Sequence, residues 1–205
     1  MVTIKLYVEG GGDSDSLHRL CRQSFRIFLE KAGFKGRMPR IVACGGRLAA
    51  YDHFKTSNES GETSLLLIDS EDFVASDSPW MHLANPSGDG FTKPENATDE
   101  HCHFMVVCME SWFLADKEAL ISYFGQGFNE TALPQNSEIE AISKKDIYDG
   151  LHKASSKCKT KAPYGKGKHS FDILLKIDPG KVCKASFWAK RFLETLDAIA
   201  GNDRI

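Results

Sequence analysis

The stretch SLLLIDSED, residues 64–72, is an apolar run followed at once by acidic side chains. A short apolar run without polar interruption is typical of a strand that is buried on both faces. Burial on both faces occurs when helices cover a parallel sheet above and below. The stretch therefore favours an α/β fold, and it places Asp69 and Glu71 where this strand ends.

Similar patterns lie on both sides of this stretch. Short apolar runs predict strands over residues 4–8, 40–44 and 104–109, with amphipathic helical patterns over 17–32, 47–55 and 110–124. The alternation of strands and helices predicts an α/β fold with a mainly parallel, Rossmann-like four-stranded sheet and flanking helices. Phe25, Phe28, Trp112, Phe113 and Phe192 are expected in the core.

The chain is expected to form one domain overall. Residues 1–125 are predicted to be the α/β core, with a long polar insert near 76–101. Residues 126–205 are predicted to be a helical extension packed on that core, with helices over 143–157, 169–177 and 185–199. A Gly-rich basic loop over 159–168 separates the first two of these helices.

The net charge conceals two opposed regions. The 205 residues carry a formal charge of −2, which by itself suggests no affinity for nucleic acid. Residues 59–118 contain 13 acidic side chains and two lysines, whereas residues 152–191 contain 11 basic and two acidic ones. The basic region is a candidate surface for a polyanion, although a solvated helical face is the alternative for most of its lysines.

Several classes of protein are disfavoured by composition. No apolar run reaches the roughly 18 residues of a membrane span, and the first residues do not resemble a secretion signal. None of the six cysteines forms a Cys-x-x-Cys pair, so reduced thiols in the cytoplasm are expected. His101, Cys102, His103 and Cys108 match no standard zinc spacing.

Carboxylates follow three of the four predicted strands. Glu9, Asp69 and Glu110 lie at these ends, and Glu71 lies two residues beyond Asp69. Right-handed connections bring the carboxyl ends of parallel strands to one edge, so these acids are expected to converge. Crowded carboxylates repel one another, and oxygen ligands of this kind suit Mg²⁺ or Mn²⁺. The alternative is that each acid caps a helix or begins a turn, which is preferred for Asp13, Asp15 and Asp116.

The glycines after Glu9, in EGGGD (residues 9–13), also have two interpretations. A Gly-rich loop between a strand and a helix can bind phosphate. The sequence lacks the Gly-Lys-Ser/Thr of a Walker A loop and the Gly-x-Gly-x-x-Gly of a dinucleotide site. The simpler role is backbone freedom that lets Glu9 face the crevice.

Two stretches carry a resemblance to a known family. YVEGGGD (7–13) and LLIDSED (66–72), each after a predicted strand, resemble the Toprim domain of topoisomerases, primases and related nucleases. The chain more closely resembles a prokaryotic Toprim-like family of unknown function, often encoded beside AAA/ABC-type ATPases in mobile and antiphage loci. CGGR (44–47), MESWFLAD (109–116) and YGKG (164–167) resemble its other motifs.

The resemblance implies a Mg²⁺-dependent nuclease that cuts DNA or RNA as an antiphage effector, together with an ATPase. It implies that Asp69 and Glu71 hold the metal, with Glu9 as general base, general acid or further ligand. Glu110 would complete the metal shell or orient a water. A glutamate replaces the second aspartate of the Toprim pair at position 71, so Asp72 stays open as an alternative ligand.

Binding of nucleic acid also requires positively charged side chains that contact its phosphates. The candidates for binding phosphates are Arg47, Lys166 and Lys168. Lys166 is also a candidate catalytic residue. Tyr164 is a candidate for stacking on a base. Two other functions stay open: a non-catalytic subunit that docks on an ATPase, and a phospho-acceptor or small-molecule phosphate domain. The oligomeric state, including a homodimer, is not determined by the sequence.

Overall fold

The sheet is the centre of the fold. The computed structural model describes residues 4–85 and 88–201, which leaves part of the N-terminal prediction and residues 86–87 of the polar insert outside. Its four strands are β1 (Lys5–Val8), β2 (Arg40–Ala43), β3 (Ser64–Asp69) and β4 (Cys102–Met105). All pairings are parallel, in the order β2-β1-β3-β4. The predicted α/β fold with a parallel four-stranded sheet is confirmed, and it is consistent with a Rossmann or Toprim-like architecture.

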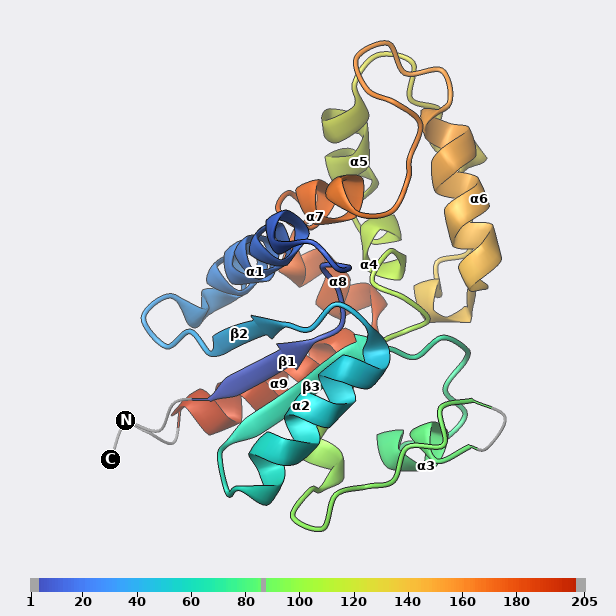
Figure 1. The fold of residues 1–205 in the computed structure, drawn as a ribbon. Helices are drawn as coiled ribbons and strands as arrows, with labels where there is room; N and C mark the ends of the chain where they lie inside the picture. The colour runs from blue at the N-terminus through green and yellow to red at the C-terminus, as the bar shows by residue number, and fades with distance from the viewer. Residues whose placement is uncertain (1–3, 86–87, 202–205) are drawn as a thin grey trace.

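Helices cover both faces of the sheet (Figure 1). The helices α1 (Asp15–Leu29) and α9 (Phe187–Gly201) pack on one face, against β2 and β4 respectively. The helices α2 (Arg47–Glu59) and α3 (Pro79–Leu83) pack on the other face. These two layers bury β3 and β4 completely, as the uninterrupted run of β3 predicts, whereas the edge strand β2 is partly exposed.

The first helix shows why the local sequence folds as it does. The Ser14 hydroxyl accepts a hydrogen bond from the amide of Leu17 at 3.2 Å, which caps α1. Its buried side chains recur at helical spacing: Cys21, Ser24, Phe25, Phe28 and Leu29. The helix ends in a wide turn, η1 (Glu30–Phe34), in which Gly33 adopts a φ of 97°. The core positions predicted for the large aromatic side chains, among them Trp112, are likewise buried.

The C-terminal helices divide into two groups. The helices α5 (Lys117–Phe124), α6 (Lys144–Ser155) and α7 (Lys168–Leu174) stand above the carboxyl ends of the strands (Figure 1). We call these three helices, with the loop of residues 156–167, the upper lobe. The helices α4 (Ser111–Leu114) and α8 (Pro179–Ala185) lie between this lobe and the sheet layer, and the single turns η2 (Asp99–His101), η3 (Glu130–Ala132) and η4 (Ile139–Ala141) complete the fold.

Some predicted boundaries are wrong. The fourth strand ends at Met105 rather than at residue 109, because the carbonyl groups of Met105 and Val107 accept from Ser70 and Glu71 in the loop after β3. The helix predicted over 110–124 is divided at Asp116, whose side chain caps α5, as preferred for this residue. The helix α8 is absent from the prediction because its first turn contains Pro-Gly.

The strand order determines where a crevice forms. The chain passes from β1 to β2 on one side and from β3 to β4 on the other, so it changes direction between β1 and β3. In open parallel sheets, ligands bind beyond the carboxyl ends of the strands at such a switch point. Glu9 follows β1 and Asp69 ends β3, so both lie at this position.

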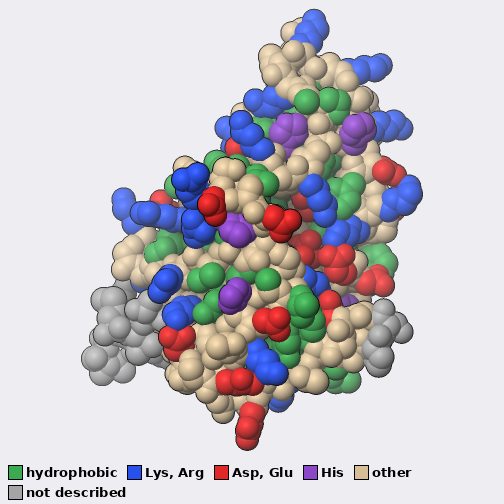
Figure 2. All heavy atoms as spheres, viewed as in Figure 1, with side chains coloured by type: hydrophobic (Ala, Val, Ile, Leu, Met, Phe, Trp, Pro, Cys, Tyr) green, Lys and Arg blue, Asp and Glu red, His purple; other side chains and the backbone are tan. Residues whose placement is uncertain are grey.

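Charge is distributed unevenly over the surface. Figure 2 shows basic side chains over the upper lobe and a group of acidic side chains beneath it. The exposed lysines of the lobe are Lys145, Lys153, Lys157, Lys159, Lys166 and Lys168. In the described part of the chain, none of the helices combines the length and the apolar character that a membrane crossing needs.

Candidate metal centre at the carboxyl edge of the sheet

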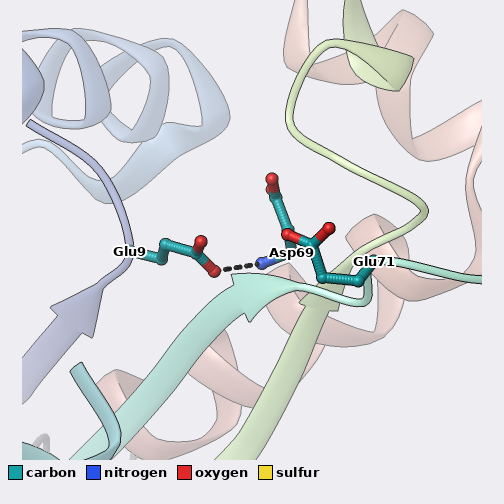
Figure 3. Close-up of side chains that lie close together, drawn as sticks. All are labelled: Glu9, Asp69 and Glu71. Atoms are coloured by element: carbon teal, nitrogen blue, oxygen red, sulfur yellow. Dashed lines mark hydrogen bonds between the residues drawn. The ribbon is translucent and has the colours of Figure 1, made fainter. Parts of the chain in front are cut away.

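Three carboxylates come together at the switch point. One oxygen from each of Glu9, Asp69 and Glu71 lies within 4.8 Å of the others. Glu9 points across from the end of β1, while Asp69 and Glu71 reach the same space from β3 and the loop after it (Figure 3). The structure therefore brings together three of the five metal ligands proposed from sequence.

Glu9 is held by the neighbouring strand β3. Its amide continues the β1–β3 ladder by donating to the Leu67 carbonyl at 3.0 Å, and its Oε2 accepts from the Asp69 amide at 3.1 Å. Behind it, Gly10 and Gly45 exchange two backbone hydrogen bonds of 2.9 Å that join the loops after β1 and β2. A Cβ atom at position 45 would lie 2.6 Å from the carbonyl oxygen of Gly12. Glycine is therefore required for this close approach.

Asp69 and Glu71 are fixed by the segment that follows β4. The Asp69 Oδ1 accepts from the Met109 amide at 2.8 Å, and the residue is only 8% exposed. Glu71 has a left-handed backbone with a φ of 68°, and its amide donates to the Val107 carbonyl at 3.0 Å. This unusual conformation directs the Glu71 side chain back toward Asp69.

The electrostatics of the cluster favour a cation. Burial, followed by the charges of Glu9 and Glu110, raises the pKa of Asp69 well above its usual value. Burial also raises the pKa of Glu9, against the lowering effect of Arg47. Ionised carboxylates in this position are costly unless positive charge offsets them.

Two basic side chains supply positive charge. Arg47 is the first residue of α2, and its guanidinium lies 3.6 Å from Glu9 Oε2. The guanidinium also forms paired hydrogen bonds of 2.7 and 2.6 Å with Asp89 and donates to the Asp69 carbonyl. Arg47 is therefore at the site, as predicted, but its guanidinium already pairs with acidic side chains.

Lys144 is the second cation, and sequence reasoning missed it. Its Nζ lies 2.6 Å from Glu71 Oε2 and 3.6 Å from Asp69 Oδ2. It is the first residue of α6, after the capping Ser143. A lysine in the first turn opposes the helix dipole, and this is the local signal that could have marked it.

Glu110 has a different set of partners. The hydroxyl groups of Tyr164 and Ser170 donate to its Oε1 at 2.7 and 3.0 Å, and that of Tyr148 donates to Oε2 at 3.0 Å. Glu110 is 4% exposed and lies outside the group of three carboxylates. The structure therefore does not bring Glu110 into the group with the other predicted ligands, and both of its oxygens accept from hydroxyl donors.

The role predicted for Tyr164 is also wrong. Its side chain is 5% exposed, and its hydroxyl is bound to Glu110 and Ser170. A ring that is buried in this way does not offer a face to a nucleic-acid base. Tyr164 instead fastens the loop of the upper lobe to the sheet.

The remaining predicted residues are placed as follows. Asp72 is exposed, accepts from the Phe73 amide at 2.7 Å and lies outside the cluster, so Glu71 takes the second acidic position. Lys166 lines a pocket of about 390 Å³ together with Glu9, Asp69 and Glu110, and its ammonium lies 4.6 Å from the centre of the Tyr148 ring. Lys168 is exposed at the start of α7 and is not among the lining residues of this pocket.

The histidine and cysteine set does not form a metal site in residues 4–85 and 88–201. The ring of His103 is buried and pairs through Nε2 with the Glu100 carbonyl, and Cys102 and Cys108 are buried free thiols. Within those residues, Glu9, Asp69 and Glu71 are the side chains of this kind that lie close enough together to hold an ion.

Comparison with known proteins gives one match. A family model described as a domain of unknown function, DUF4276, matches residues 8–197. The comparisons with curated proteins and with solved structures each returned no match. The matched range includes the three clustered carboxylates and both cations that contact them.

Proposed function

Since the chain belongs to the DUF4276 family of unknown function, we propose from its own site that it is a Mg²⁺-dependent nuclease of the Toprim type. The observation that carries this proposal is the convergence of Glu9, Asp69 and Glu71 within 4.8 Å at the switch point of the sheet. The reaction is hydrolysis of a phosphodiester bond in DNA or RNA.

The residues of the cluster fit a divalent metal. The donor set consists of carboxylate oxygens, which Mg²⁺ and Mn²⁺ prefer, and the burial of Asp69 creates a need for positive charge. Asp69 and Glu71 would hold the ion, with Glu9 as a neighbour or third ligand. When bound, Mg²⁺ supplies a Lewis acid that offsets the charge of a phosphate.

Other side chains have roles of their own. The raised pKa of Glu9 lets it hold or accept a proton closer to neutral pH than an ordinary glutamate does. Lys166 lines the same pocket as Glu9 and Asp69, so its positive charge is available to phosphate oxygens near the carboxylates. Arg47 lies beside Glu9 and adds positive charge there, although its guanidinium is paired with Asp89.

A polyanionic substrate is supported by the surface charge. Basic side chains cover the upper lobe, above a group of acidic side chains (Figure 2), and the exposed lysines of the lobe would give the backbone of a nucleic acid a basic surface. Lys168 belongs to this surface. Such contacts position the backbone without selecting a sequence.

The biological setting rests on the resemblance of the sequence. This resemblance supports a role for the protein as an antiphage effector that works together with an AAA/ABC-type ATPase. The cysteines are free thiols, and this supports the proposed cytoplasmic location.

The test is a cleavage assay with a matched control. Purified protein, alone and with a candidate partner ATPase, is incubated with DNA and RNA in Mg²⁺, in Mn²⁺ and in a chelator. We expect metal-dependent cleavage that Asp69→Asn abolishes and Asp72→Asn retains, because Asp72 lies outside the cluster. Absence of cleavage under every condition, or full activity of Asp69→Asn, would count against the nuclease. Absence of metal binding with unchanged biological activity of Asp69→Ala would favour a non-catalytic subunit.

A phospho-acceptor domain is the second candidate. The observation that favours it is the lysine beside a buried aspartate, with Lys144 Nζ 3.6 Å from Asp69 Oδ2. Incubation with acetyl phosphate and Mg²⁺, followed by intact-mass measurement, distinguishes the two functions. A gain of one phosphoryl group that Asp69→Asn prevents would support the acceptor, and an unmodified chain would remove it.

A further inference from the structure

Lys144 occupies the position that a bound cation would need. Its ammonium lies 2.6 Å from Glu71 and 3.6 Å from Asp69, and the lysine side chain is 22% exposed. It thus pairs with the two residues that are the proposed metal ligands. Arg47 pairs with the third carboxylate, Glu9, at 3.6 Å.

The pairing offsets part of the negative charge of the cluster without any ion. Three carboxylates face two basic side chains, and positive charge from Lys144 offsets the cost of burying Asp69. A lysine is a compact, strongly hydrated charge on a flexible stem, so its ammonium can exchange with solvent more readily than an arginine fork. Arg47 is additionally fixed by its paired hydrogen bonds to Asp89.

A dication and the ammonium cannot share these oxygens. Mg²⁺ requires its ligand oxygens at about 2.0–2.1 Å, which would place it within a few ångströms of the Lys144 nitrogen. Repulsion between the two cations at that distance is strong in a partly buried site. One of them must leave.

We infer that Lys144 is a built-in competitor of the divalent cation, which neutralises Asp69 and Glu71 until the ion enters and is then released toward solvent. This inference rests on the proposed function, because it assumes that the carboxylate cluster is the metal site. It adds a form of regulation: the negative charge of the site is partly offset at low metal concentration, and the site loads only when the ion outcompetes the lysine.

The movement is confined to the side chain. Ser143 caps α6 by accepting from the Asp146 amide at 3.1 Å, and Tyr148, one turn further, is anchored to Glu110. Neither contact involves the Lys144 ammonium. The helix can therefore keep its place while the lysine stem rotates away from the cluster.

The first experiment uses the wild-type protein. Lysine labelling with acetic anhydride, followed by peptide mass spectrometry, compares the protein in a chelator with the protein in saturating Mn²⁺. We expect the modification of Lys144 to rise severalfold when Mn²⁺ is added. Lys145 is the internal control, since it is 81% exposed and pairs with Asp149, away from the cluster.

The second experiment measures metal affinity in variants by calorimetric titration with Mn²⁺. We expect Lys144→Met to bind Mn²⁺ more tightly by about tenfold, and Lys145→Met to match the wild type. Lys144→Arg keeps the charge and should restore an affinity near that of the wild type.

The outcomes separate this inference from the proposed function. If Mn²⁺ binds but neither the labelling of Lys144 nor the affinity of Lys144→Met changes, the competitor role is wrong and the metal site stands. If Mn²⁺ binds none of the proteins, the metal site fails and the competitor role fails with it. Because the labelling requires no substitution, an unfolded variant would not prevent either conclusion.

Discussion

Two kinds of buried carboxylate lie in the same pocket, and they are neutralised in different ways. Glu110 accepts hydrogen bonds from the hydroxyl groups of Tyr148, Tyr164 and Ser170. Asp69 has a single amide donor to its side chain, from Met109, and otherwise depends on the ammonium of Lys144. The two carboxylates are close enough that the charge of Glu110 raises the pKa of Asp69.

The difference indicates separate roles. The donors to Glu110 come from α6, from the basic loop and from α7, so this one carboxylate joins three segments of the upper lobe to the sheet. Hydroxyl groups that are held in this way do not leave readily, since each would lose its partner inside the protein. The partner of Asp69 is a flexible lysine. Glu110 is thus suited to holding the lobe in place, and Asp69 is suited to exchanging partners.

The largest effect that separates the two roles is expected from Asp69→Asn. We expect its Mn²⁺ affinity to fall by at least about a hundredfold, because it removes the charge of a direct ligand and not merely an outer partner. Calorimetric titration measures the change, with Asp72→Asn as the control. An Asp69→Asn variant that binds Mn²⁺ as the wild type does would remove Asp69 from the metal centre.

The next effect concerns the folding of the lobe. We expect Glu110→Ala to lower the free energy of unfolding by about 3 kcal/mol, because three buried hydroxyl groups lose their acceptor. Urea unfolding measures the loss, and Tyr148→Phe and Tyr164→Phe should each cost about 1 kcal/mol. If Glu110→Ala instead keeps its stability and loses Mn²⁺ binding, Glu110 belongs to the metal centre after all.

A smaller effect is expected in the pH dependence of stability without metal. Burial, with the charges of Glu9 and Glu110, raises the pKa of Asp69, and Lys144 opposes this rise. The folded protein therefore binds the Asp69 proton more tightly than the unfolded chain does. This contribution to stability is complete below the ordinary aspartate pKa of 3.8 and is lost as pH rises through the raised pKa.

The measurement is urea unfolding in a chelator at several pH values from about 5 to about 8. We expect the wild type to lose more of its free energy of unfolding than Asp69→Asn does over this range. Added Mn²⁺ should reduce the loss, since it binds the ionised form. A wild-type profile that matches that of Asp69→Asn would show that Asp69 does not titrate in this way.

The smallest effect is expected at the exposed lysines of the lobe. We expect Lys168→Ala to weaken nucleic-acid binding by only a few fold. The slope of the logarithm of affinity against the logarithm of salt concentration should become shallower by about one, as for the loss of one phosphate contact. Its stability should stay within about 0.5 kcal/mol of the wild type. Fluorescence anisotropy over a salt series measures both the affinity and the slope. An unchanged slope would place Lys168 outside the binding surface.

Much of the framework could be predicted from the sequence, because strands and their ends are local features. The apolar run before Asp69 and the glycines after Glu9 predict both the parallel sheet and the position of two carboxylates at its edge. The fourth strand was predicted too far along the chain. The buried residues 106–109 resemble strand residues in the sequence, but this segment forms hydrogen bonds with the loop after β3.

The partners of the carboxylates could not be predicted in the same way. Lys144 lies 73 residues from Glu71 in the chain, and the three hydroxyl donors to Glu110 are 38 to 60 residues from it. Contacts of this kind depend on how the upper lobe packs over the sheet, which no local pattern specifies. The same packing explains why Tyr164 resembles an exposed loop residue in the sequence and is buried in the fold.

The hydrogen-bonded pair Gly10 and Gly45 bears on how relatives of this chain can be compared. A side chain at position 45 would meet the backbone of Gly12, so the loops after β1 and β2 would separate and carry Glu9 away from Arg47. A relative could keep every acidic residue and still lose this arrangement through one alanine. The two glycines are therefore a separate marker by which to recognise, in other members of the family, chains that retain the same site.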